Sequence, residues 1–161
     1  MSLAYRVVTP SIKWLAGVLC EIDDAQLARV PMQGPLIIVT NHVNFFEVPV
    51  IYTHLLPRRI VGLAKSETWN NPLKRVLANL WGAIPLRRGE PDTKAMRRAL
   101  DVLEAGGIIV IAPEGTRSGH GRLQQGHPGV VLLAVRSGAP ILPIVFYGAE
   151  DIWRNLARLR R

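Results

Sequence analysis

The chain is poor in cysteine, and its few potential metal ligands are scattered. Cys20 is the only cysteine, so the chain cannot form an internal disulfide, and this usage fits a reducing compartment. No histidine lies near Cys20 in the sequence, so we expect a small buried or interfacial apolar residue and not a nucleophile. The spacing of the histidines matches no zinc signature, and no metal site is predicted.

Long hydrophobic runs are also missing. No apolar stretch approaches the roughly 18–20 residues that a membrane-spanning helix needs. The stretch from Trp14 to Cys20 is short, and no small-residue cleavage site follows it in good context, so no signal peptide is predicted. The chain has neither a Gly-x-Ser-x-Gly elbow nor a Gly-x4-Gly-Lys loop, which argues against a serine hydrolase and a nucleoside triphosphatase.

Acidic residues are outnumbered by basic ones. There are 20 Lys and Arg against 12 Asp and Glu, which gives a formal net charge of +8. Such a surplus attracts nucleic acid, anionic membranes or phosphorylated substrates. No nucleic-acid motif surrounds the basic residues, so no nucleic-acid partner is predicted. They form four clusters, namely Arg58–Arg59, Arg87–Arg88, Arg97–Arg98 and the tail with Arg154, Arg158, Arg160 and Arg161.

The length of 161 residues and a hydrophobic content of 48% predict one packed domain over residues 1–161. Residues 33–148 should form the core that carries the motifs, preceded by an amphipathic segment and loop over residues 1–32. Residues 3–20 combine apolar side chains with Lys13 and Trp14, and Pro10 divides them. Two interpretations are equally supported: a helix lying in a membrane interface, or an amphipathic helix packed on the domain.

Short apolar runs alternate with segments of helical spacing. Strands are predicted at residues 36–40, 60–64, 83–86, 108–112 and 141–146. Helices are predicted at residues 47–56, 72–80, 91–105 and 128–136. This alternation predicts an α/β fold, with a mainly parallel sheet flanked by helices. Residues beyond the carboxyl ends of such strands line the ligand crevice.

His42 and Glu47 follow the first predicted strand. A histidine there can act as a general base when a carboxylate fixes its tautomer. On one regular helix the two side chains would point about 140° apart, because each residue turns the helix by about 100°. They can meet only if His42 lies in the turn and Glu47 in the first helical turn. The alternative is a loop histidine and a helix-start glutamate without catalytic roles.

A second motif, Pro-Glu-Gly-Thr-Arg-Ser at residues 113–118, follows the fourth predicted strand. Arg117 can hold a phosphate through its planar fork of donors, and Gly115 allows backbone amides to approach an anion. Thr116 adds a hydroxyl, and Glu114 would orient Arg117 or bind a substrate hydroxyl. A tight turn closed by an ion pair is an equal alternative.

Further residues near these motifs carry weaker signals. Arg87 and Arg88 follow the third predicted strand and can form an anion clamp, although a solvated basic turn is the alternative, more so for Arg87. His120 and His127 lie close to the presumed phosphate loop, but loop histidines are more often bystanders. The late Pro-Ile-Leu-Pro segment at residues 140–143 is interpreted as structural.

Together these segments resemble the glycerolipid acyltransferase family, in particular the 1-acylglycerol-3-phosphate acyltransferases. The resemblance covers about residues 33–148 and rests on Asn-His-x4-Glu, Gly-x-Ile-x-x-x-Arg, Pro-Glu-Gly-Thr-Arg-Ser and Pro-Ile-x-Pro blocks. It implies that His42 deprotonates the acceptor hydroxyl and that Glu47 aligns His42. It also implies that the acceptor's glycerol phosphate is held by Arg88, Glu114, Gly115, Thr116 and Arg117.

The resemblance further implies the substrates and the cellular location. The donor would be acyl-CoA or acyl-ACP, the acceptor a lysophospholipid, and the product phosphatidate, with no other cofactor. The protein would bind the cytoplasmic face of the membrane peripherally and would have acyl carrier protein as a possible partner. Alternatives are another acceptor, such as glycerol 3-phosphate, or a catalytically silent lipid-binding homologue. The family usually has Asp where this chain has Glu47, and it continues with further sheet beyond the last strand.

Overall fold

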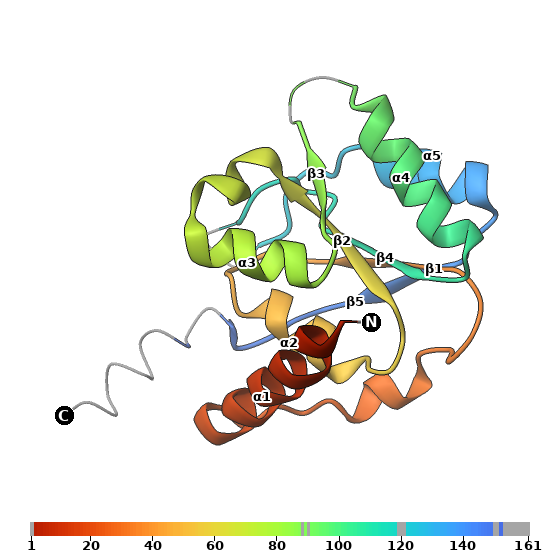
Figure 1. The fold of residues 1–161 in the computed structure, drawn as a ribbon. Coiled ribbons are helices and arrows are strands. Elements are labelled where there is room, and N and C mark those ends of the chain that lie inside the picture. Colours follow the sequence, from red (N-terminus) through yellow and green to blue (C-terminus); the bar gives the residue numbers. More distant parts are fainter. Residues whose placement is uncertain (1, 88, 90, 119–121, 150–151, 153–161) are drawn as a thin grey trace.

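The computed structural model describes residues 2–87, 89, 91–118, 122–149 and 152. Its five strands form one sheet in the order β3-β2-β4-β1-β5, and every neighbouring pair is parallel (Figure 1). The sheet confirms the predicted α/β class. The strands are β1 (Leu36–Thr40), β2 (Ile60–Lys65), β3 (Ile84–Leu86), β4 (Ile108–Ile111) and β5 (Ile141–Ile144).

Helices connect the strands as the sequence predicts, with small shifts at their ends. They are α1 (Leu3–Leu19), α2 (Glu47–His54), α3 (Pro72–Leu80), α4 (Thr93–Glu104) and α5 (Gly129–Ser137), with short 3-10 helices η1 (Ala25–Arg29) and η2 (Ser66–Asn70). α4 begins at Thr93 and not at Pro91, because the Asp92 side chain accepts from the backbone N–H of Ala95 and so caps the helix.

Helix α1 runs unbroken through Pro10, so the prediction that Pro10 divides this segment is wrong. Pro10 and Arg6 both lie on the exposed part of the helix. The Arg6 carbonyl, which loses its intrahelical donor at Pro10, is therefore accessible to water. Ser2 caps the helix by accepting from the backbone N–H of Tyr5, and the half-buried Cys20 ends it.

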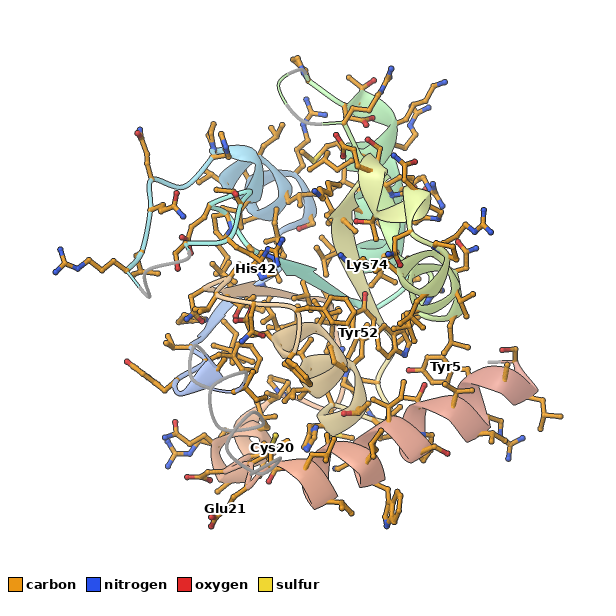
Figure 2. The ribbon with its side chains drawn as sticks, turned by 90° about the vertical axis from the view of Figure 1, so that its left-hand side faces the viewer. Tyr5, Cys20, Glu21, His42, Tyr52 and Lys74 are labelled. Carbon is orange, nitrogen blue, oxygen red and sulfur yellow. The ribbon has the colours of Figure 1, made fainter. Side chains whose placement is uncertain are left out.

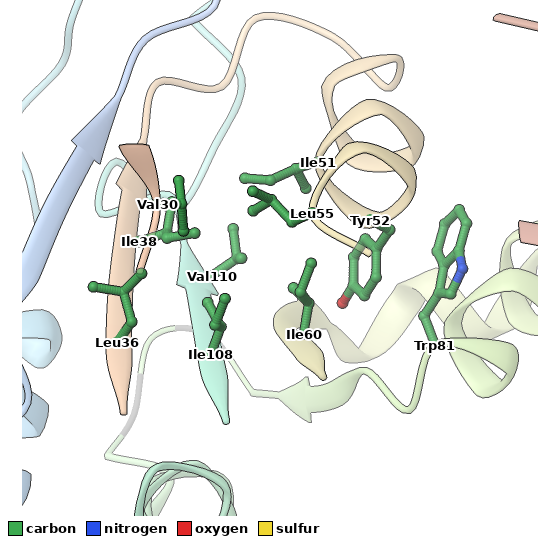
Figure 3. Packing of buried hydrophobic residues seen from close by; sticks show 10 residues of the cluster. All are labelled: Val30, Leu36, Ile38, Ile51, Tyr52, Leu55, Ile60, Trp81, Ile108 and Val110. Atoms are coloured by element: carbon green, nitrogen blue, oxygen red, sulfur yellow. The ribbon is translucent and has the colours of Figure 1, made fainter. Parts of the chain in front are cut away.

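Two apolar clusters cover the two faces of the sheet. On one face, residues of the central strands pack against α2, and Tyr52 stacks on Trp81 with ring centroids 4.5 Å apart (Figure 3). On the other face, Ile37, Val61 and Ile109 pack with residues of α4 and with Leu133 of α5. With both faces covered, the carboxyl edge of the sheet is left as the place for a site.

Helix α1 has two apolar faces. One face packs on the domain: Tyr5 and Ile12 join the first cluster, and the Trp81 indole N–H donates to Thr9 Oγ1 at 3.3 Å. Figure 2 shows Tyr5 on the side of α1 turned toward Tyr52. The opposite face is exposed and carries Leu3, Val7, Trp14 and Val18. The packed interpretation is therefore confirmed for one face only. Among the described residues, no helix is both long and apolar enough to cross a bilayer.

Arg58, from the first basic cluster, has a structural position. Its side chain is buried and donates to the backbone carbonyls of Pro31, Gly34 and Gly106. Burial lowers the pKa of its guanidinium. Arg58 therefore fixes the loop before β1 and does not add to the surface charge available for an anion.

Candidate active site

The turn between β1 and α2 brings His42 and Glu47 together. His42 Nδ1 lies 2.8 Å from Glu47 Oε2, as the sequence requires if the pair is to meet. Glu47 is the first residue of α2, and its side chain is 3% exposed. Its other oxygen, Oε1, accepts from the backbone N–H groups of Val43 and Asn44, each at 2.8 Å. A carboxylate is also favourable at a helix N-terminus.

This contact determines how the His42 ring is protonated. A carboxylate only accepts hydrogen bonds, so Nδ1 must carry the hydrogen that it donates to Glu47. In the neutral ring Nε2 is then unprotonated and can accept a proton. The His42 side chain is 26% exposed, so a substrate can reach it while the carboxylate behind it stays buried.

Two asparagines hold this turn against the end of β5. Asn41 Nδ2 donates to the Phe146 carbonyl at 2.9 Å, and the Phe146 N–H donates to Asn41 Oδ1 at 2.8 Å. Asn44 Oδ1 accepts from the backbone N–H of Phe46, two residues along, and Asn44 Nδ2 donates to the Ala149 carbonyl. Neither asparagine was predicted to have a role. Asn44 alone had a local signal, because an Asn side chain often accepts a hydrogen bond from the backbone N–H two residues later.

The loop after β4 carries the second motif and lies against the first. The Ser118 N–H donates to the His42 carbonyl at 2.9 Å, which joins the two motifs directly. Gly115 has a φ of +66°, a conformation that favours glycine. Thr116 and Arg117 line the same cavity as His42, and so do Gly115 and His127.

Glu114 and His127 have contacts in the structure that the sequence does not specify. The buried carboxylate of Glu114 accepts from the Gln124 N–H at 3.0 Å, and Glu114 does not line the cavity. The His127 N–H donates to the Pro113 carbonyl at 2.8 Å, and a Cβ on Gly115 would lie 3.1 Å from the His127 ring. His127 is thus packed against the motif. The sequence placed His127 close to this loop but did not indicate which residue of the loop it contacts.

The loop after β3 adds positive charge to the cavity. Arg87 lines it, and the Arg87 N–H and Nε lie 3.1 and 3.8 Å from Asp92 Oδ2. The pKa of Asp92 lies below its usual value. The main cause is the hydrogen bond from the backbone N–H of Ala95, and the next is that from the backbone N–H of Arg87. Arg88, predicted to hold the acceptor's phosphate, lies outside the described residues.

One cavity joins these groups along the carboxyl edge of the sheet. Its volume is about 1450 Å³, and it reaches from His42 to apolar residues beneath α3 and to α4 and α5. Figure 2 shows that His42 and Lys74 lie on the same side of the domain, away from α1. Lys74 lies over the Phe45 ring, 5.8 Å from its centre. A base, cations and apolar walls thus share one space.

The acyltransferase family model matches residues 21–147, which cover most of the chain. The chain belongs to the acyltransferase family. This acyltransferase chain is 32% identical over 153 residues to the 1-acyl-sn-glycerol-3-phosphate acyltransferase of Limnanthes alba. The aligned residues cover 93% of this chain and 53% of that protein. It is 29% identical to the lyso-ornithine lipid O-acyltransferase of Pseudomonas aeruginosa, over 92% of this chain and 62% of that protein.

A solved structure supports the fold of this acyltransferase chain. The crystal structure of the 1-acyl-sn-glycerophosphate acyltransferase from Thermotoga maritima matches with a TM-score of 0.64 and 22% identity, over 87% of this chain and 57% of that chain. The chain thus spans about half the length of the relatives that it matches. These likenesses show the fold and the family.

Proposed function

We propose that the protein transfers a fatty acyl group from acyl-CoA or acyl-ACP to the free hydroxyl of 1-acylglycerol 3-phosphate. The observation that carries this proposal is the His42–Glu47 pair, 2.8 Å apart, in the same cavity as Arg117. Relatives named as 1-acyl-sn-glycerol-3-phosphate acyltransferases match over most of the chain and support the same assignment.

In the proposed reaction, His42 acts as the general base. Nε2 removes the proton of the acceptor hydroxyl as its oxygen attacks the thioester carbonyl. A tetrahedral oxyanion forms, and its collapse makes the ester bond and breaks the carbon–sulfur bond. The leaving thiolate takes the proton from His42, which returns the ring to its neutral form. The buried Glu47 carboxylate stabilises the transient imidazolium.

The acceptor's phosphate would bind the loop after β4. Arg117 can donate two parallel hydrogen bonds to a phosphate, and the neighbouring Thr116 hydroxyl can add a third. We propose that Arg88 also contributes, as the family resemblance implies. Apolar cavity walls formed by Tyr52, Leu77 and Trp81 suit the acyl chains of the substrates.

We also propose that α1 attaches the protein to the cytoplasmic face of the membrane. Its exposed apolar face includes Trp14, which is 70% exposed, and the basic residues Arg6 and Lys13 lie beside that face. Trp and flanking Lys or Arg are typical of helices that lie in a membrane interface. Replacing Trp14 by Ala should lower binding to anionic vesicles in a sedimentation assay. Unchanged sedimentation would contradict this role.

The name of one relative suggests a second candidate acceptor. The lyso-ornithine lipid O-acyltransferase is as similar to this chain as several 1-acyl-sn-glycerol-3-phosphate acyltransferases are. A lyso-ornithine lipid is therefore the alternative acceptor. The cationic lining around Arg117 favours the phosphate-bearing one.

The test is the release of thiol from acyl-CoA, followed with a thiol reagent. Release should depend on added lysophosphatidate and should disappear in the His42→Ala variant. Parallel reactions with glycerol 3-phosphate and lyso-ornithine lipid rank the acceptors by kcat/KM. The proposal fails if none of these acceptors stimulates thiol release, and a higher kcat/KM for lyso-ornithine lipid would select the alternative.

A further inference from the structure

The cavity contains more positive charge than a single acceptor phosphate requires. Among the described residues that line it, seven are Lys or Arg and two, Glu47 and Asp92, are acidic. Both carboxylates are already bound by backbone N–H groups. A phosphomonoester carries a charge of about −1.5 to −2 at neutral pH, so Arg117 and one neighbour would balance it. The remaining cations point to a second anionic group.

Two of these cations, Arg97 and Arg136, come from α4 and α5, and the part of the cavity lined by these two helices is named the groove. In α4, the cavity-lining residues Met96 and Leu100 are four apart and share one face with Arg97. In α5, Leu132 and Arg136 are likewise four apart and line the same cavity. The two helices pack beside each other on the same face of the sheet (Figure 1).

The groove has an apolar floor and a charged rim. Leu133, which is fully buried, and the half-buried Met96 and Leu100 form the floor, whereas Arg97 and Arg136 are exposed. An elongated ligand with a weakly polar body and an anionic end would match this pattern, because the floor favours dehydrated groups and the rim favours negative charge.

The groove begins at the proposed active site and leads away from it. Gly129, the first residue of α5, lies two residues after His127, which packs on the Gly115 turn. From Gly129 to Arg136 the helix advances by about 10 Å, at roughly 1.5 Å per residue. An anion near Arg136 would therefore be separated from the reacting carbonyl by a long linker.

We infer that this groove binds the phosphopantetheine arm of the acyl donor, with Arg97 and Arg136 at its phosphate. The inference rests on the proposed function. The acceptor's phosphate sits on the same glycerol as the reacting hydroxyl, so it must bind close to His42. In the donor, the pantetheine arm separates the thioester from the phosphate, as the groove requires. Acyl-CoA and acyl-ACP share this arm, and both therefore fit.

The experiment compares donors with and without the phosphate. Steady-state KM and kcat are measured with acyl-CoA, acyl-phosphopantetheine and acyl-pantetheine, each with lysophosphatidate as acceptor. Arg97→Ala and Arg136→Ala should each raise the KM of the first two donors roughly tenfold, the loss expected for one charge-assisted hydrogen bond. The KM of acyl-pantetheine and the acceptor KM should stay unchanged. Acyl-ACP should behave like acyl-CoA.

Arg98→Ala is the matched control. Arg98 is the neighbour of Arg97 on α4 and is also exposed, but it does not line the cavity. This variant should retain the KM of every donor, which separates a local contact from a general loss of positive charge. Circular dichroism melting curves verify that each variant is folded.

Several results would overturn the inference. One is an equal rise in the KM of acyl-pantetheine, and another is a rise in the acceptor KM in place of the donor KM. The others are the same rise in donor KM in Arg98→Ala, or an unchanged donor KM in folded Arg97→Ala and Arg136→Ala. A loss with acyl-CoA but none with acyl-phosphopantetheine would place the two arginines at the nucleotide and would also refute it. Failure of the proposed function is a separate result, because the unsubstituted protein would then turn over none of the three donors.

Discussion

The turn after β1 and the loop after β4 share one cavity but are built in opposite ways. In the turn, the functional side chains bind each other: Glu47 accepts from His42 and from the backbone N–H groups of Val43 and Asn44. In the loop, backbone groups and the buried Glu114 make the internal contacts, such as the bond from the Gln124 N–H, while Arg117 faces the cavity.

This difference follows from what each region has to do in the proposed reaction. A general base needs one tautomer and one orientation before the substrate arrives, so its partners must be fixed within the protein. A cation that binds phosphate must leave its donors available for the ligand. The hydrogen bond from the Ser118 N–H to the His42 carbonyl, 2.9 Å long, fixes the position of the loop relative to the turn.

The largest effect is expected from removing the base. In His42→Ala no group would accept the hydroxyl proton, and kcat should fall by about 10³-fold, the middle of the range for general-base catalysis. The side chain is partly exposed, so the melting temperature should change little. Thiol release and thermal melting measure the two quantities. Substantial turnover in the folded variant would remove His42 from the mechanism.

A smaller loss is expected when the carboxylate becomes an amide. In Glu47→Gln, the side-chain oxygen can still accept from the Val43 and Asn44 N–H groups, which leaves the amide NH₂ facing His42 Nδ1. That arrangement favours the tautomer with the hydrogen on Nε2, which cannot act as a base. We expect kcat to fall about 100-fold, the lower end of the contribution of a general base, because the imidazole itself remains in the site.

Glu47→Asp is the control for this change, because it keeps the charge and shortens the arm by one methylene. It should retain more activity than Glu47→Gln. A larger loss in Glu47→Asp than in Glu47→Gln would show that the length of the side chain, more than its charge, determines the rate. That result would weaken the view that the turn is organised around an orienting carboxylate.

The turn after β1 was the easier region to predict from sequence. The run at residues 36–40 predicted the strand, and the spacing of His42 and Glu47 allowed contact only across the turn, where the structure has it. These are short-range constraints, set by chain geometry over a few residues. The hydrogen bonds of Asn41 to Phe146, 105 residues away, depend on strand order, which local patterns do not encode.

The loop after β4 was predicted less completely. The motif located Gly115 and Arg117, but the partners of Glu114 and His127 depend on how residues 122–128 fold back. Glu114 was expected either to orient Arg117 or to bind a substrate hydroxyl. Burial against a backbone N–H is equally compatible with the sequence. The sequence showed the basic pair Arg97–Arg98, but the groove that Arg97 shares with Arg136 depends on the packing of α4 beside α5.

The next effect in size concerns Arg117. Arg117→Ala removes the cation proposed to hold the phosphate, and the acceptor KM should rise about 30-fold, within the range for hydrogen bonds to charged groups. The donor KM should stay unchanged, because Arg97 and Arg136, which are inferred to bind the donor's phosphate, remain in place. Arg75→Ala, an exposed residue outside the cavity, is the control. An unchanged acceptor KM in Arg117→Ala would refute its role in binding phosphate.

The smallest effect is expected for Glu114→Gln. This variant tests whether the buried acid of the loop after β4, unlike Glu47 in the turn after β1, has only a structural role. An amide oxygen can accept from the Gln124 N–H as the carboxylate does, so a residue that only anchors the loop should tolerate the change. The acceptor KM should then rise by no more than about threefold, corresponding to less than about 1 kcal/mol. Glu114→Ala leaves the half-buried Gln124 N–H without this acceptor, which should cost about 1 kcal/mol in stability. A large fall in activity for a stable Glu114→Gln protein would instead mean that the carboxylate charge acts on the substrate. The loop after β4 would then resemble the turn after β1, with a buried acid taking part in the chemistry.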